Sequence, residues 1–143
     1  MMDALVVTLL AWICVHTSLH APDPPRVVSV STKMMNRMMN APESVSIRAL
    51  YNRSEKIVYL REDWDISNVR DRSDLLHELV HHVQNFNKVP AACIMALEED
   101  AFNLQFAWLR DQGVADPSNV VGVNPLFVVL LSRCAEGETG SAG

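Results

Sequence analysis

The sequence lacks the features by which the most common macromolecular partners are recognised. Basic residues are not in surplus, because 12 Lys and Arg stand against 17 Asp and Glu, and runs of like charge are absent. Binding to a phosphate backbone requires a basic surface, so the composition argues against a nucleic-acid partner. The apolar segment at residues 4–15 (ALVVTLLAWICV) is too short to span a membrane, which argues against a transmembrane segment.

This N-terminal segment has two interpretations. Residues 4–15 have the length of a signal-peptide apolar region, and a tolerable cleavage site follows at residues 19–21. However, Asp3 stands where a signal peptide would carry Lys or Arg. The segment also places several large side chains on one helical face: Leu5, Leu9, Trp12, Ile13 and His16. We favour a structural helix within residues 1–20, which goes with a cytoplasmic protein, whereas a signal peptide would mean export.

The length of 143 residues suits one domain, which we place at residues 1–134, followed by a disordered polar tail at 135–143. The patterns predict an α+β fold, with a small twisted sheet of about three strands packed on a central helix. The expected elements are a strand at 27–31, a methionine-rich helix at 32–39, a hairpin at 44–51 and 56–60, helices at 74–84, 90–112 and 125–134, and a loop at 116–119.

The central helix carries the most informative motif of the chain. His77, Glu78 and His81 have the spacing HExxH within residues 74–84 (DLLHELVHHVQ), and Asp71 or Ser73 is expected to cap the helix. Two histidines four residues apart share a helical face and can reach one metal ion. This is the pattern of zinc proteases, in which the glutamate takes a proton from water. The motif also occurs by chance, so a third ligand is needed.

The remaining sequence restricts the choice of that ligand. A third histidine in the pattern HExxHxxGxxH would need Gly at 84 and His at 87, but the chain has Gln84 and Asn87. An upstream cysteine ligand, as in peptide deformylase, would have to be Cys14, which lacks the flanking residues of that family. A carboxylate from the helix LEEDAFNLQFAWL is left, and Glu98 lies on its inward face with Ala101, Phe102, Gln105 and Leu109.

We therefore rank Glu98 above Glu99 as the third ligand. Asp100 is a candidate partner for a ligand imidazole N–H, a contact that metal-bound histidines usually make. The alternative is that these acidic side chains form a solvated helix face.

HELVHHVQ followed by ExxAxxxQ resembles the gluzincin class of zinc metallopeptidases in its small, single-domain form, the minigluzincins. The order of elements also resembles an uncharacterised bacterial domain family of this type. The resemblance implies a zincin-like fold, zinc held by His77, His81 and Glu98, and Glu78 as general base for hydrolysis of a peptide or protein substrate. It further implies that KIVYL, residues 56–60, is an edge strand on which an extended peptide lies.

One departure from the larger gluzincins concerns the oxyanion. Those enzymes place a histidine or tyrosine after the glutamate ligand, and this chain has neither beyond Glu98. The candidates to replace that donor are Tyr51, Tyr59 and His82, although a position beside the ligands or on the surface suits His82 better. Losing one oxyanion donor costs about a hundredfold to a thousandfold in rate.

Two functions are therefore open. The first is a zinc-dependent metallohydrolase, most simply a metallopeptidase. The second is a non-catalytic, zinc-stabilised binding module, favoured by the missing donor and by the methionines of residues 32–39.

The three cysteines leave a further choice, because Cys93 and Cys134 could pair if their helices pack antiparallel, or all three could be buried thiols. The sequence does not specify the oligomeric state.

Overall fold

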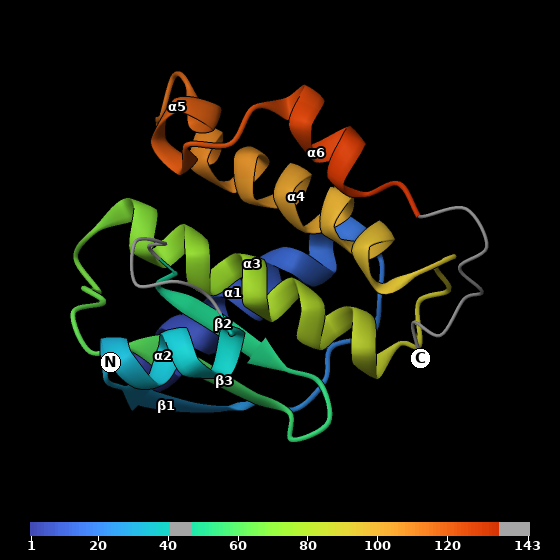
Figure 1. Ribbon diagram of the computed structural model, residues 1–143. Helices are drawn as coiled ribbons and strands as arrows, with labels where there is room; N and C mark the ends of the chain where they lie inside the picture. Colours follow the sequence, from blue (N-terminus) through green and yellow to red (C-terminus); the bar gives the residue numbers. More distant parts are fainter. Residues whose placement is uncertain (41–46, 135–143) are drawn as a thin grey trace.

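The protein consists of a three-stranded sheet and six α-helices in the residues that this computed structural model describes, 1–40 and 47–134 (Figure 1). The predicted α+β class is confirmed. No described helix combines the length and the apolar character needed to cross a membrane. In chain order the elements are α1 (Met2–Thr17), β1 (Arg26–Val30), α2 (Thr32–Met39), β2 (Ala49–Asn52), β3 (Ile57–Arg61), α3 (Val69–Phe86), the 3₁₀ helix η1 (Ile94–Ala96), α4 (Leu97–Asp111), α5 (Pro117–Val121) and α6 (Pro125–Leu131).

The sheet has the strand order β1-β3-β2. β3 pairs in parallel with β1, with Val28 opposite Tyr59, and antiparallel with β2, with Leu50 opposite the same tyrosine. The expectation that KIVYL forms an edge strand is therefore wrong, because β3 is hydrogen-bonded on both sides and β2 lies at the edge. Of the first hairpin strand predicted at 44–51, residues 44–46 lie outside the described residues, and β2 begins at Ala49.

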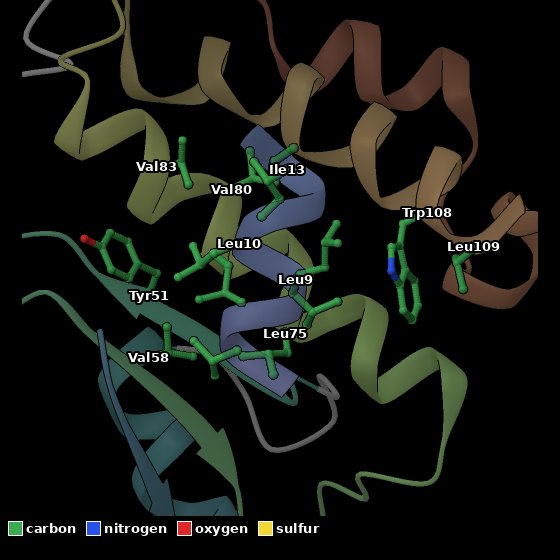
Figure 2. Packing of buried hydrophobic residues seen from close by; sticks show 14 of the residues in the cluster. Leu9, Leu10, Ile13, Tyr51, Val58, Leu75, Val80, Val83, Trp108 and Leu109 are labelled. Carbon is green, nitrogen blue, oxygen red and sulfur yellow. The ribbon is translucent and has the colours of Figure 1, made fainter. Parts of the chain in front are cut away.

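The core lies where α3 packs against the sheet on one side and against α1 and α4 on the others (Figure 1). Leu75 and Val80 of α3 meet Leu9, Leu10 and Ile13 of α1 in the same buried cluster, as Figure 2 shows. α1 buries Val6, Leu9, Leu10 and Ile13, so its inward face differs from the predicted one, and His16 is exposed. The helix that carries the motif is thus enclosed along most of its length.

The N-terminal end of α3 is fixed by a buried ion pair. Arg48 donates to both carboxylate oxygens of Asp71, at 2.6 and 2.7 Å, and the side chain of Asp71 is 3% exposed. The helix begins at Val69, where the Asn68 side chain accepts a hydrogen bond from the Asp71 N–H. The prediction that Asp71 or Ser73 caps the helix is therefore wrong, because Arg48 binds the Asp71 carboxylate instead.

The segment between α3 and α4 also differs from the prediction. Pro90 does not start a helix; the chain is extended at Cys93 (φ −158°, ψ 166°) and becomes α-helical only at Leu97. Cys93 forms a disulfide with Cys134, with 5.8 Å between their Cα atoms. The loop predicted at 116–119 instead begins the short helix α5, which runs from Pro117 to Val121 and is capped by the Asp116 side chain. The tail predicted at 135–143 lies outside the described residues.

Candidate metal centre

Three side chains of α3 form a cluster that could hold a metal ion. His77, Glu78 and His81 each bring a ligand atom to within 4.8 Å of the others. Both histidines are buried, because the helix face that carries them packs against α4 rather than facing solvent. The imidazole rings lie edge to face, with their centroids 5.0 Å apart. The HExxH spacing therefore places both rings beside one point, as one helical turn requires.

Glu98 reaches the same point from the first turn of α4. One carboxylate oxygen lies 3.1 Å from Nε2 of His77, and the other lies 2.6 Å from Nε2 of His81. Ala101, the next residue on this face, is fully buried, and its small side chain lets the two helices approach closely. Glu99 is exposed, as a residue one step around the helix should be. Two nitrogens and a carboxylate thus converge between two helices.

The side chain of Gln105 orients His77 from behind. Its amide oxygen lies 2.9 Å from Nδ1 of His77, and its amide nitrogen donates to Oδ1 of Asp74 at 2.9 Å and to Oγ of Ser73 at 3.0 Å. Oγ of Ser73 donates its proton to the backbone oxygen of Arg70 at 2.6 Å and can only accept from Gln105, so Ser73 fixes which end of the amide faces which partner. Nδ1 of His77 must then carry the proton and donate it to Gln105. Nε2 is left facing Glu98.

Gln84 holds His81 in the same way. Its amide oxygen lies 2.8 Å from Nδ1 of His81, and its amide nitrogen donates to the backbone carbonyl oxygen of Leu97 at 3.1 Å. The carbonyl can only accept, so the amide oxygen faces the imidazole and Nδ1 is the donor. Outer hydrogen bonds of this kind set the ring orientation of histidines that bind metals. Both imidazoles consequently direct Nε2 at the same point.

The electrostatics of the site follow from this geometry. Burial alone would lower the pKa of His81, but its hydrogen bond with Glu98 and the nearby carboxylates outweigh burial and raise the pKa to about 9. Burial opposes ionisation of Glu98, and the hydrogen bonds from both histidines prevail and hold its pKa well below the ordinary value. Without a cation, a proton on His81 therefore balances the charge of Glu98.

Glu78 differs from Glu98 in having no partner for one of its oxygens. Burial raises the pKa of its carboxyl group, and Oε2 is buried without a hydrogen bond to any described residue. A buried carboxylate oxygen that lacks a partner is costly unless a ligand, an ion or water satisfies it. The unpartnered atom therefore marks a position where the site can take up a further polar group.

The donor set fits a small divalent cation. Ligand atoms around tetrahedral zinc, with bonds of about 2.1 Å, are separated by about 3.4 Å. The Glu98 oxygens lie 3.1 and 2.6 Å from the two Nε2 atoms, so a slight outward shift of this carboxylate would admit the ion in place of the proton on His81. Glu78 belongs to the metal-capable cluster, but it forms no ion pair with the imidazoles and is better placed to contact a group bound beside the ion.

A cavity of about 310 Å³ opens on this centre. It reaches from His77 and Glu78 along α3 to Arg70, and Phe102 packs edge to face on His77 with 4.4 Å between ring centroids. Other lining residues come from the edge strand β2 with its preceding residues and from the segment after α4: Ile47, Arg48, Ala49, Val121 and Val123. The cavity therefore reaches the centre at His77 and Glu78, whereas His81 and Glu98 do not line it.

Several residues expected near the centre lie elsewhere. The Tyr51 hydroxyl lies 2.8 Å from Nδ1 of His82, and Nε2 of His82 donates to the backbone carbonyl of Asp23. His82 is thus buried in a separate network, not exposed and not beside the ligands. Tyr59 donates from its hydroxyl to Glu55, 3.1 Å away. None of these three aromatic side chains lines the described cavity.

Asp100 is exposed and does not hold a ligand imidazole, because Gln105 and Gln84 contact the two Nδ1 atoms. The sequence contained a signal for Gln105, which shares the inward face of its helix with Glu98; a polar residue on a buried face usually has a specific partner. Gln84 lies one turn beyond His81 on the same helix, and this position likewise indicated a contact with the imidazole.

A protein-family model matches nearly the whole chain. The model for Domain of unknown function (DUF6647) matches residues 1–139. The chain belongs to this family. Membership of DUF6647 agrees with the resemblance to an uncharacterised domain family, and the family description carries no link to gluzincins. Neither the curated proteins nor the solved structures gave a match.

Proposed function

We propose that this DUF6647 protein is a zinc-dependent metallohydrolase that cleaves peptide bonds. The observation that carries the proposal is the convergence of the His77 and His81 Nε2 atoms on the Glu98 carboxylate, beside the unpartnered oxygen of Glu78. His77, His81 and Glu98 would hold the ion. Two imidazoles and one carboxylate are a set that zinc accepts in catalytic sites, where the remaining position is open.

Zinc, when bound, supplies a Lewis acid that polarises a carbonyl group and makes water more acidic. The protein supplies the rest. Gln105 and Gln84 keep both Nε2 atoms directed inward, so the ligands need little rearrangement when the ion enters. The closed packing of α3 against α4 keeps bulk water from the two imidazoles, which strengthens every charge interaction at the centre.

Glu78 acts as the general base and then as the general acid. Its carboxylate accepts a proton from the attacking water and delivers it to the leaving amine, so that the peptide C–N bond breaks. Burial raises the pKa of Glu78, which improves it as a proton acceptor. The unpartnered Oε2 is available to the water, because no described side chain competes for it.

The position of β2 favours an extended substrate. Ile47 and Ala49 line the cavity, and β2 forms one edge of the described sheet, with β1 at the other and β3 between them. The free edge of a strand offers backbone N–H and C=O groups to which an extended peptide can hydrogen-bond. A peptide placed along this edge would pass the metal centre on α3.

The test is the Glu78→Gln variant, which keeps the shape of the side chain and removes the base. We expect it to bind zinc with wild-type stoichiometry and to lose hydrolysis of a peptide library, measured by mass spectrometry of the products. Glu99→Gln, on the exposed face of α4, is the matched control and keeps wild-type activity. Wild-type turnover by Glu78→Gln would disprove the assigned role.

A second function, a zinc-stabilised binding module without catalysis, is favoured by one observation. Tyr51, Tyr59 and His82 contact other groups and do not line the described cavity, so none of them is placed to stabilise an oxyanion there. The methionine segment gives no further support, because α2 does not line this cavity. No cleavage of the library by the zinc-loaded protein, together with a large fall in Tm on chelation, would favour the module.

A further inference from the structure

The cavity is lined by an arginine whose Nε has no hydrogen-bond partner among the described residues. Arg70 lies two helical turns before Glu78 on α3, and both residues line the cavity. The Arg70 Nε is buried without a hydrogen-bond partner among the described residues. Oδ2 of Asp74 lies 3.8 Å from this atom, which is beyond hydrogen-bonding length. The side chain is 43% exposed, so the rest of the guanidinium is accessible from solvent.

Arg48, the other arginine that lines the cavity, is in the opposite situation. Its guanidinium donates to both oxygens of Asp71 and to Oδ2 and the backbone oxygen of Asp63, at 2.6 to 3.0 Å. Two carboxylates therefore neutralise it, and its role is structural. Among the described residues Arg70 has a single ion-pair partner, Asp74, whose Oδ2 lies 3.8 Å from Nε and whose Oδ1 accepts from Gln105.

A guanidinium in this state is suited to bind a carboxylate. Its five N–H donors form a planar fork that matches the two oxygens of a carboxylate, and paired charged hydrogen bonds of this kind are among the strongest in proteins. A buried donor without an acceptor also costs stability, which a ligand oxygen would recover. The chemistry of Arg70 therefore points to an anionic group on the molecule that enters the cavity.

We propose that Arg70 binds a carboxylate of the substrate and so selects peptides that carry a negative charge close to the cleaved bond. This inference rests on the proposed hydrolase function and names its substrate class. The carboxylate is either the C-terminal α-carboxylate of a short peptide or the side chain of an acidic residue. In both cases Arg70 is a specificity-determining residue, whereas Glu78 performs the proton transfer.

The dimensions of the cavity agree with this role. Nε of Arg70 lies 3.8 Å from Oδ2 of Asp74, and Asp74 precedes Glu78 by four residues, about 6 Å along the helix. An extended peptide covers about 3.3–3.6 Å per residue, so a carboxylate at Arg70 would lie about one to two residues from the bond that Glu78 attacks. Phe102, Val121 and Val123 supply apolar surface beside this path. A substrate with an apolar residue next to its carboxylate would use both features.

The experiment compares three probes by isothermal titration calorimetry with the zinc-loaded protein. The probes are acetyl-Ala-Phe with a free C-terminus, the same peptide as its C-terminal amide, and acetyl-Ala-Glu amide. The proteins are wild type, Arg70→Met, Arg70→Lys and the control Arg110→Met, which removes an exposed arginine that does not line the cavity. Thermal melts of each variant establish that it is folded.

We expect wild type and Arg110→Met to bind one of the two carboxylate probes about ten- to a hundredfold more tightly than the neutral amide. Arg70→Met should abolish that preference and leave the affinity for the amide unchanged. Arg70→Lys, which keeps the charge and loses the fork, should retain a smaller preference. A preference for the free C-terminus identifies the α-carboxylate as the group, and a preference for the glutamyl amide identifies the side chain.

Equal affinity of wild type for all three probes would overturn the proposal, as would the absence of binding by both carboxylate probes. A loss of affinity for the amide and the acids alike in Arg70→Met would also overturn it, because it would assign Arg70 a general role in binding. Hydrolysis is scored separately. A preference for the carboxylate probes without cleavage would support the role of Arg70 and count against the hydrolase. Cleavage without such a preference would support the hydrolase and count against the role of Arg70.

Discussion

Replacement of Gln105 by alanine tests whether the two glutamines prepare the site for a metal ion. Gln105 is 1% exposed, and its amide makes three hydrogen bonds of 2.9 to 3.0 Å, to His77, Asp74 and Ser73. The variant leaves Nδ1 of His77 without its acceptor, so the ring is free to rotate away from the direction that points Nε2 at the centre. Loss of such an outer contact weakens metal binding by about ten- to a hundredfold.

The loss has a second component, because the partners of Gln105 are buried. Each buried polar group left without a partner costs about 1–3 kcal/mol, so we expect the metal-free variant to unfold at a lower urea concentration than wild type. Zinc affinity is measured by competition with a chromophoric chelator under conditions where the variant is folded. Gln112→Ala removes an exposed glutamine one residue past α4 and serves as the control. A zinc affinity of Gln105→Ala within twofold of wild type would refute the reasoning.

Two further predictions concern the framework around the centre. The disulfide between Cys93 and Cys134 closes a loop of 41 residues. Replacing both cysteines by serine should therefore reduce the free energy of unfolding, measured in urea, by about 4 kcal/mol. A reduction of less than about 1 kcal/mol would contradict this estimate. Tyr51→Phe removes a hydroxyl that contacts His82 and Asn85, and should cost about 1–3 kcal/mol of stability while zinc affinity and any turnover stay as in wild type. Lower turnover at unchanged zinc affinity would show that Tyr51 acts in the reaction.

The sequence predicted the parts of the site that depend on local geometry. HExxH places two imidazoles on one face of a helix wherever that helix lies, and the inward face of the following helix separates Glu98 from Glu99. Both arguments need only the helical repeat. Gln105 shares this inward face with Glu98, so its position indicated a buried hydrogen-bond partner. That partner is His77, which is determined by the packing of α4 against α3.

The features that the sequence did not predict depend on contacts between distant segments. Asp71 has the chemistry of a helix cap, but Arg48 of the preceding hairpin binds its carboxylate, and Asn68 caps the helix in its place. The apolar run KIVYL is equally compatible with an edge or a central strand, and the parallel pairing with β1 decides between them. Pro90 is compatible with a helical first turn, yet the chain is still extended at the disulfide-bonded Cys93.

The most direct test of the central claim is the zinc content of four purified proteins after reconstitution, measured by elemental analysis: wild type, His81→Ala, Glu98→Ala and Glu99→Ala. Two imidazoles and the Glu98 carboxylate converge on one point, whereas Glu99 is exposed. We predict one zinc ion per chain in wild type and Glu99→Ala, and sharply lower occupancy in the other two. Wild-type zinc content in Glu98→Ala, or no stoichiometric zinc in wild type, would contradict the account.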